Sequence, residues 1–94
     1  MLALFPGGAR IEDGVLTLDG LAATELAERF GTPLVVYSEQ ALRERAQLFR
    51  RAAPDALVVY GTKAFPNVAL MRLLAEEGLG ADVSTLGERA FARA

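Results

Sequence analysis

The chain has 94 residues, of which 52% are hydrophobic and 23% charged, a composition typical of a folded globular protein. Its net charge of −2 gives no general attraction to nucleic acid or to an anionic membrane. The absence of cysteine and histidine excludes disulfides, thiolate chemistry, Cys/His zinc sites and Ser-His nucleophiles within these residues. No stretch approaches a membrane span, and the amino terminus lacks the features of a signal peptide, so we expect a soluble, cytoplasmic protein.

The first 30 residues predict a hairpin followed by a helix. Apolar and polar residues alternate over residues 10–18 around Asp13-Gly14, a dipeptide that tolerates the positive φ of a tight turn. Residues 21–30 carry apolar side chains near helical spacing, and Gly31 suits the left-handed conformation that ends a helix. We therefore expect a short antiparallel strand pair and one helix here.

A strand and a helix are predicted next. Residues 33–37, PLVVY, form an apolar, β-branched run that predicts a first buried strand. Ser38 suits the N-cap of a helix over residues 39–53, which Pro54 ends. Arginines interspersed with glutamates in this helix indicate a solvated charged face.

The same order then recurs. LVVY at residues 57–60 predicts a second strand, and Pro66-Asn67 opens a helix that runs toward Gly78. GADVS at residues 80–84 predicts a third strand. The following Thr-Leu-Gly-Glu matches a capping box, and its helix has no stop signal before the end of the sequence.

Strands that alternate with helices and are apolar on both faces indicate parallel pairing in a right-handed α/β arrangement. Doubly wound sheets and closed (β/α)₈ barrels both fit this pattern. Three strands cannot close a barrel, and an open three-stranded sheet would leave bare apolar edges. We therefore expect the first part of a longer protein.

Lys63, the only lysine, follows the second predicted strand. The C-terminal ends of parallel strands surround the ligand site in such folds, although position alone favours a lysine that covers apolar surface and reaches water. Phosphate binding and Schiff-base formation are the functional alternatives, and the sequence lacks both GxxxxGK[ST] and GxGxxG. A Schiff-base lysine must be neutral, which requires desolvation or a nearby positive charge.

Other polar residues have ordinary structural explanations. Asp82 ends the apolar part of the third predicted strand, and it either orients a charged group at the same edge or caps a turn. Glu88 fits the capping partner of Thr85 better than a site residue. Tyr37 and Tyr60, at strand ends, are typical of aromatic side chains at a core edge with a hydrated hydroxyl.

Three motifs carry a family resemblance: FGTPLVVY, VVYGTKAF and GADVSTLGE. Together they resemble the amino-terminal part of the diaminopimelate decarboxylase family, pyridoxal-phosphate enzymes of the alanine-racemase-type barrel class. The resemblance covers nearly the whole chain from residue 11 onward. Phe65-Pro66-Asn67 departs from the Asn-x-Asn-like residues that are common after the lysine.

The resemblance implies a fold and a site. The fold would be α/β, the N-terminal part of a (β/α)₈ TIM barrel. Residues 1–20 would be strands of a second β domain, and residues 21–94 the first βα units of the pyridoxal-phosphate-binding barrel. Lys63 would hold pyridoxal 5'-phosphate through a Schiff base, and Asp82 would lie beside the lysine and the cofactor.

The resemblance also implies an activity. A full-length homodimer would decarboxylate meso-2,6-diaminopimelate to L-lysine, with no nucleic acid or membrane partner. The family's phosphate loop and ring-nitrogen acid fall beyond residue 94, so we expect the 94-residue chain alone to be inactive.

Three alternatives remain open. Relatives that decarboxylate ornithine, arginine or carboxynorspermidine would keep Lys63. A catalytically silent barrel homologue that binds or regulates would have no need for Lys63 and Asp82. A free-standing α/β interaction domain is disfavoured by the final helix, which has no stop signal.

Overall fold

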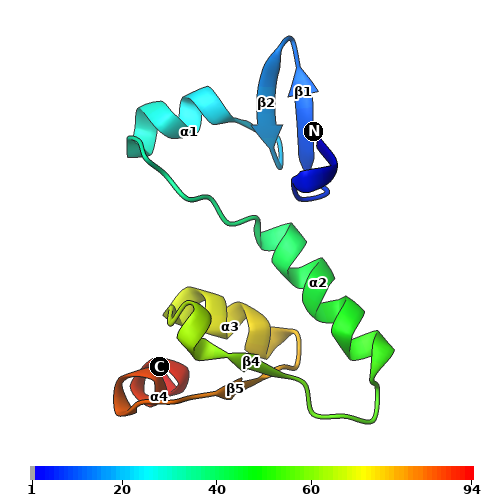
Figure 1. Ribbon diagram of the computed structural model, residues 1–94, viewed down its shortest axis with the longest axis vertical. Coiled ribbons are helices and arrows are strands. Elements are labelled where there is room, and N and C mark those ends of the chain that lie inside the picture. Colours follow the sequence, from blue (N-terminus) through cyan, green and yellow to red (C-terminus); the bar gives the residue numbers. More distant parts are fainter. Residues whose placement is uncertain (1) are drawn as a thin grey trace. The chain divides into compact units, whose positions relative to one another are not determined.

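The computed structural model describes residues 2–94 and separates into two compact units, with the boundary between Leu42 and Arg43 (Figure 1). Helix α2 (Glu39–Ala52) contributes residues to both units. None of the helices in residues 2–94 combines the length and apolar character needed to cross a membrane.

The first unit contains a three-stranded antiparallel sheet in the order β1-β2-β3, preceded by a short 3₁₀ helix, η1 (Leu2–Leu4). Strand β1 (Ala9–Glu12) pairs with β2 (Val15–Leu18), so only two residues form the loop between them. Asp13 has φ 50° and Gly14 φ 76°, as a two-residue hairpin turn of the primed type requires. The predicted hairpin is confirmed.

A second turn of the same kind follows. Asp19 and Gly20 have φ 50° and 85°, and they join β2 to β3 (Leu21–Ala22). The prediction that the helix begins at residue 21 is wrong, because residues 21 and 22 form β3. The Asp19-Gly20 dipeptide carries the signal that correctly identified the first turn, so the sequence contained the information.

Helix α1 (Ala23–Phe30) ends at Gly31, whose φ of 79° agrees with the predicted stop. The next segment, residues 33–37, is not the buried strand that its composition predicts. It belongs to neither sheet, and its apolar side chains are exposed, from 38% at Leu34 to 78% at Val35. An apolar β-branched run favours an extended backbone, but a strand also needs a neighbour that pairs with its N–H and C=O groups.

Helix α2 starts as predicted. The Ser38 hydroxyl accepts a hydrogen bond from the Ala41 amide at 3.1 Å, which satisfies one of the donors left free at a helix start. The same hydroxyl donates to the Asp19 carboxylate at 2.5 Å. Ala46 is the buried residue of this helix, and the helix ends two residues before Pro54.

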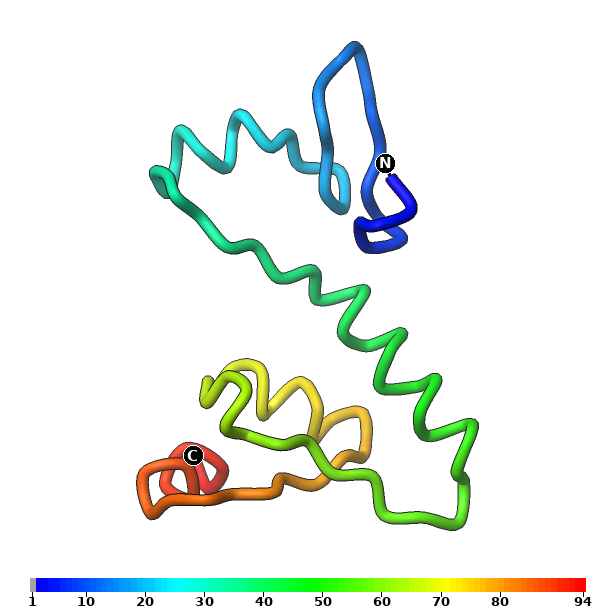
Figure 2. Tube along the Cα trace, viewed as in Figure 1, coloured from blue at the N-terminus to red at the C-terminus, as the bar shows by residue number. Residues whose placement is uncertain are grey.

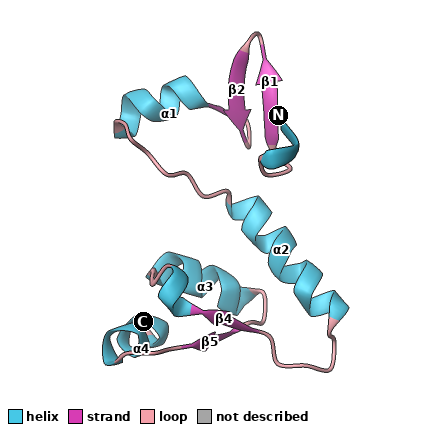
Figure 3. Cartoon of the chain, viewed as in Figure 1, coloured by secondary structure: helices cyan, strands magenta, loops and turns pink. Residues whose placement is uncertain are grey.

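The second unit is built on a βαβ arrangement (Figures 2 and 3). Strand β4 (Val59–Gly61) pairs in parallel with β5 (Gly80–Asp82), and helix α3 (Val68–Glu76) connects them. A short 3₁₀ helix, η2 (Thr62–Ala64), directly follows β4, and α4 (Leu86–Arg93) follows β5. Helix α3 packs against β5 and α4 and buries Leu70, Met71 and Leu74.

Both ends of α3 are closed by local hydrogen bonds. At the start, Asn67 Oδ1 accepts from the Leu70 amide at 2.9 Å. At the end, Gly78 has φ 86°, and the amides of Gly78 and Leu79 donate to the carbonyls of Ala75 and Leu74. This pair of bonds is the Schellman motif, so both predicted boundaries of the helix have a physical basis.

The parallel sheet differs from the prediction in extent and burial. It contains two strands among residues 2–94, and β4 begins at Val59 rather than at Leu57. Val59 is 47% exposed and Leu57 79% exposed, so the strands are not covered on both faces. Burial of a strand depends on the layers packed against it, which the apolar run itself does not provide.

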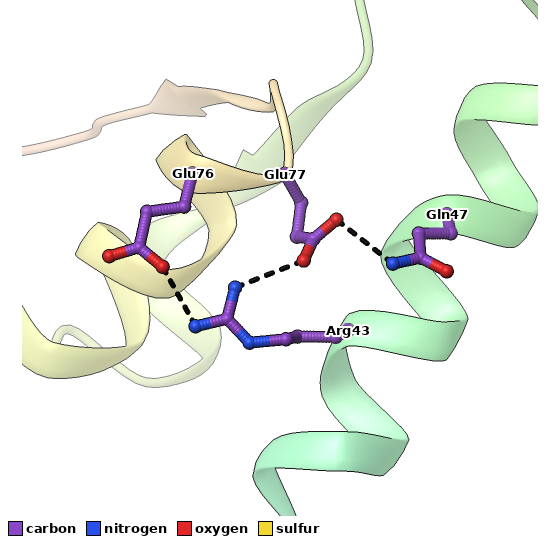
Figure 4. A network of polar contacts seen from close by, with 4 residues as sticks. All are labelled: Arg43, Gln47, Glu76 and Glu77. Atoms are coloured by element: carbon purple, nitrogen blue, oxygen red, sulfur yellow. Dashed lines mark hydrogen bonds and ion pairs between the residues drawn. The ribbon is translucent and has the colours of Figure 1, made fainter.

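The sequence predicted a solvated charged face for α2, but one of its arginines, Arg43, forms ion pairs instead. Arg43 donates to Glu76 at 2.7 Å and to Glu77 at 3.0 Å, and Gln47 donates to Glu77 at 3.2 Å (Figure 4). The Arg43 guanidinium holds the pKa of the Glu77 carboxyl below its usual range, and the bond from Gln47 acts in the same direction. This network links α2 to the end of α3.

Candidate functional site

The parallel register of β4 and β5 brings two of the predicted site residues to one edge. Gly61, the last residue of β4, lies opposite Asp82, the last residue of β5. Lys63 follows two residues after Gly61, in η2. The amine-bearing turn and Asp82 therefore both lie at the C-terminal edge of the sheet, where ligands bind in parallel α/β folds.

Among residues 2–94, no hydrogen bond or ion pair joins the side chains of Lys63 and Asp82. Lys63 and Asp82 are both exposed, and within residues 2–94 neither side chain takes part in an ion pair. A hollow lined by Tyr60, Met71 and Leu74 contains neither of them. The desolvation that a neutral lysine requires is thus not provided by residues 2–94.

Thr62, between the strand and Lys63, is the most buried side chain at this edge, with no exposed surface. Its hydroxyl lies 2.8 Å from the Asp82 carbonyl and 2.5 Å from Glu88 Oε1. Thr62 is not among the predicted site residues. No local pattern could have indicated it, because its partners lie 20 and 26 residues further along the chain.

Glu88 has the predicted capping role and a further contact. Thr85 Oγ1 accepts from the Glu88 amide at 3.0 Å at the start of α4, which confirms the cap. The Glu88 side chain is buried and binds the Thr62 hydroxyl. That hydrogen bond, followed by those from Thr85 and the backbone amides of Ser84 and Thr85, lowers the pKa of the Glu88 carboxyl.

The two tyrosines differ in their surroundings. The Tyr60 hydroxyl donates to the Phe65 carbonyl at 3.2 Å, so it spans the turn that contains Lys63. Tyr37 is 55% exposed and follows the irregular segment 33–36. Tyr60 therefore helps to close the turn, in agreement with an aromatic residue at a core edge.

This chain has a βαβ unit with a lysine and an aspartate at the C-terminal edge of its strands. Such an arrangement is typical of parallel α/β domains, in which small molecules and cofactors bind at this edge. Residues 39–94 match the family profile described as "Pyridoxal-dependent decarboxylase, pyridoxal binding domain". The chain belongs to this family of pyridoxal-dependent decarboxylases.

Proteins named diaminopimelate decarboxylase are among those similar to this chain. The chain is 51% identical over 90 residues to a diaminopimelate decarboxylase of Actinosynnema pretiosum, covering 96% of this chain and 21% of that protein. A crystal structure from Aquifex aeolicus matches with 44% identity and a TM-score of 0.88, covering 92% of this chain and 22% of that one. Diaminopimelate decarboxylase from M. jannaschii, crystallised with L-lysine, matches with 39% identity and a TM-score of 0.77, covering 95% and 23%.

The chain therefore spans about a fifth of the length of these relatives. The expected fold class is confirmed: the chain is mixed α/β with a small leading antiparallel sheet, and it matches the amino-terminal part of this decarboxylase fold.

The donor set at the strand edge fits one end of pyridoxal phosphate, the cofactor of this family. The cofactor's aldehyde condenses with a primary amine, and Lys63 is the only lysine and is exposed at the ligand edge. The sequence has no Gly-rich loop to bind the phosphate. Residues 2–94 also contain no cluster of side chains that could hold a metal ion.

Proposed function

We propose that this chain contributes the cofactor-bearing lysine to an enzyme that decarboxylates meso-2,6-diaminopimelate to L-lysine. The observation that carries the proposal is the position of Lys63, the only lysine, in the turn that directly follows β4. The names of the relatives support the choice of substrate, as does the complex of one relative with L-lysine.

In this proposal Lys63 is the catalytic residue, and Lys63 and Asp82 bind the cofactor. The Lys63 amine would hold pyridoxal 5'-phosphate by condensing with its aldehyde carbon, with loss of water. Asp82, at the end of the neighbouring strand, would supply a carboxylate at the same edge. When bound, the cofactor supplies the electron sink that allows the bond to the carboxyl carbon to break.

Borohydride reduction of the full-length protein tests the role of Lys63. After incubation with pyridoxal phosphate and reduction, we expect mass spectrometry to find a pyridoxyl adduct on Lys63. Lys63→Arg keeps the positive charge but cannot form an imine, so decarboxylation should fall by about 1000-fold or more. Arg45→Lys adds a lysine on the exposed surface of α2 as a matched control, and it should take up no adduct and leave activity unchanged. An unmodified Lys63 would reject the proposal.

A substrate panel tests the assignment of diaminopimelate. Carbon dioxide release should be fastest with the meso isomer of diaminopimelate and slower by at least about 100-fold with ornithine, arginine and carboxynorspermidine. If one of these three amines is decarboxylated faster than diaminopimelate, the protein is still an amino-acid decarboxylase, but its substrate is that compound. No release from any of them, despite an adduct on Lys63, would reject decarboxylation.

We further infer that the full-length protein is a cytoplasmic homodimer whose residues 1–20 belong to a β domain and residues 21–94 to a barrel. The support is the family resemblance of the three sequence motifs. Light scattering coupled to size-exclusion chromatography should give twice the mass of the full-length polypeptide. A mass equal to that of one full-length polypeptide would contradict the dimer.

A further inference from the structure

The C-terminal edge of the sheet contains a buried polar contact that joins three elements. Thr62 follows the last residue of β4, and its hydroxyl reaches the carbonyl of Asp82 at the end of β5 and the carboxylate of Glu88 in the first turn of α4. Thr62 has no exposed surface, and Glu88 is 8% exposed. The contact is thus shielded from water, where hydrogen bonds to a charged acceptor are strong.

This contact continues the sheet by one residue beyond its backbone ladder. The last ladder pair is Gly61 with Asp82, after which the chain turns into η2. The Thr62 hydroxyl then donates to the Asp82 carbonyl, in place of a further backbone bond between the strands. The residue immediately before Lys63 is therefore fixed to the strand that ends in Asp82.

Glu88 holds the hydroxyl from the other side. Its carboxylate lies at the amino-terminal end of α4, where the helix dipole favours negative charge. A carboxylate accepts several hydrogen bonds, whereas a threonine hydroxyl has a single hydrogen to share between its two acceptors. The hydroxyl therefore shares its one hydrogen between the Glu88 carboxylate and the Asp82 carbonyl, and no buried side-chain polar atom of residues 2–94 lacks a partner.

We propose that Thr62 is a positioning residue for Lys63: its hydroxyl, held by Glu88 and the Asp82 carbonyl, fixes the start of the lysine turn at the ligand edge. The Lys63 side chain is long and exposed, so only its backbone anchor restricts where the amine can reach. Displacement of a reacting group by about 1 Å can reduce its reactivity by about 100-fold. The inference rests on the proposed role of Lys63 in binding pyridoxal phosphate.

The test compares three variants of the full-length protein. Thr62→Val keeps the shape of the side chain and removes the hydroxyl, whereas Thr62→Ser keeps the hydroxyl. Thr17→Val is the matched control, because Thr17 is also buried and its hydroxyl also donates to a backbone carbonyl, that of Arg10. Thr17 lies in β2 of the antiparallel sheet, and not at the C-terminal edge of the parallel sheet that precedes Lys63.

Amide hydrogen exchange of the cofactor-free protein provides the first readout. We expect exchange at residues 61–64 to become about tenfold faster in Thr62→Val and to stay at the wild-type rate in Thr62→Ser and Thr17→Val. Unchanged exchange in Thr62→Val would overturn the proposal. If this variant does not fold, Glu88→Gln replaces it, and its exchange at residues 61–64 should become about threefold faster. An unchanged rate would again overturn the proposal.

Borohydride trapping gives the second readout. The pyridoxal phosphate concentration that half-saturates the Lys63 adduct should rise about tenfold in Thr62→Val and less than about twofold in Thr62→Ser. Faster exchange with unchanged half-saturation would reduce Thr62 to a structural role and overturn the proposal. Failure of the wild-type protein to form the adduct would reject the proposed function instead, and hydrogen exchange would still decide whether Thr62 fixes the turn.

Discussion

Glu77 shows how a single charged side chain depends on its neighbours. Its carboxylate accepts from Arg43 and Gln47, two residues one turn apart on α2 (Figure 4). Both bonds favour the ionised form and lower the pKa of Glu77 in the folded protein. A carboxyl group with a lowered folded-state pKa stabilises the fold above its unfolded pKa, and this contribution disappears as the pH falls through the folded pKa.

The predicted consequence is a pH-dependent effect of Arg43→Met. Near neutral pH this variant should lower the melting temperature of the full-length protein by about 1 to 2 °C, because the ion pairs are partly exposed. The difference should shrink as the pH falls below about 4.3, where the unfolded carboxyl is already protonated. Thermal unfolding from pH 3 to 7 measures it, with Arg45→Met as the control. A difference that grows toward low pH would contradict the assignment.

At the scale of the elements, the start of α3 depends on one side chain. Asn67 accepts from the Leu70 amide and so satisfies a donor that the helix leaves unpaired. Asn67→Ala should destabilise the helix by about 1 kcal/mol, and Asn67→Ser, which retains an acceptor, by a few tenths at most. Hydrogen exchange of the α3 amides measures both values. If Asn67→Ala and Asn67→Ser destabilise α3 equally, the hydrogen bond from the Leu70 amide to residue 67 does not stabilise the helix.

Alanine substitutions at two glycines, one at the end of α3 and one in α4, should change helix stability in opposite directions. Gly78 has φ 86°, and an added Cβ would lie 3.2 Å from the Arg50 guanidinium carbon. Gly78→Ala should therefore destabilise the end of α3 by about 1 kcal/mol or more. Gly87, in α4, has room for a Cβ at 3.7 Å from the Thr85 hydroxyl, so Gly87→Ala should stabilise α4 by about 0.5 kcal/mol. Hydrogen exchange of the amides of α3 and α4 measures the two changes in stability. If both substitutions destabilise or both stabilise their helix, the explanation from glycine conformation is contradicted.

Local elements were the ones that sequence reasoning predicted well. The Asp13-Gly14 turn, the Ser38 and Thr85 caps, the helix start at Pro66-Asn67 and the Gly31 stop all follow from contacts between residues a few positions apart. The strand predicted at residues 33–37 depends instead on a distant pairing partner, and it was wrong. Strand β3 was missed although the Asp19-Gly20 turn before it is of the same local kind.

At the scale of the whole molecule, the proposed activity needs more than the strand edge. Lys63 and Asp82 are exposed, and the sequence has no Gly-rich loop for a phosphate. We therefore predict that the purified 94-residue chain releases no appreciable carbon dioxide from diaminopimelate, whereas the full-length protein does. Trapped carbon dioxide measures both, with the Lys63→Arg full-length protein as the blank. Release from the 94-residue chain above this blank would overturn the prediction.

The sequence by itself determined the Asp13-Gly14 turn, the end of α1 at Gly31, the starts of α2, α3 and α4, and the position of Lys63 after a strand. Only the tertiary structure decided that β4 pairs with β5, that residues 33–37 remain exposed, and that Thr62 is buried between Asp82 and Glu88. The physical reason is distance along the chain. A turn or cap is satisfied within three or four residues, whereas the bonds of Thr62 join residues 20 and 26 positions apart, and only folding brings these together.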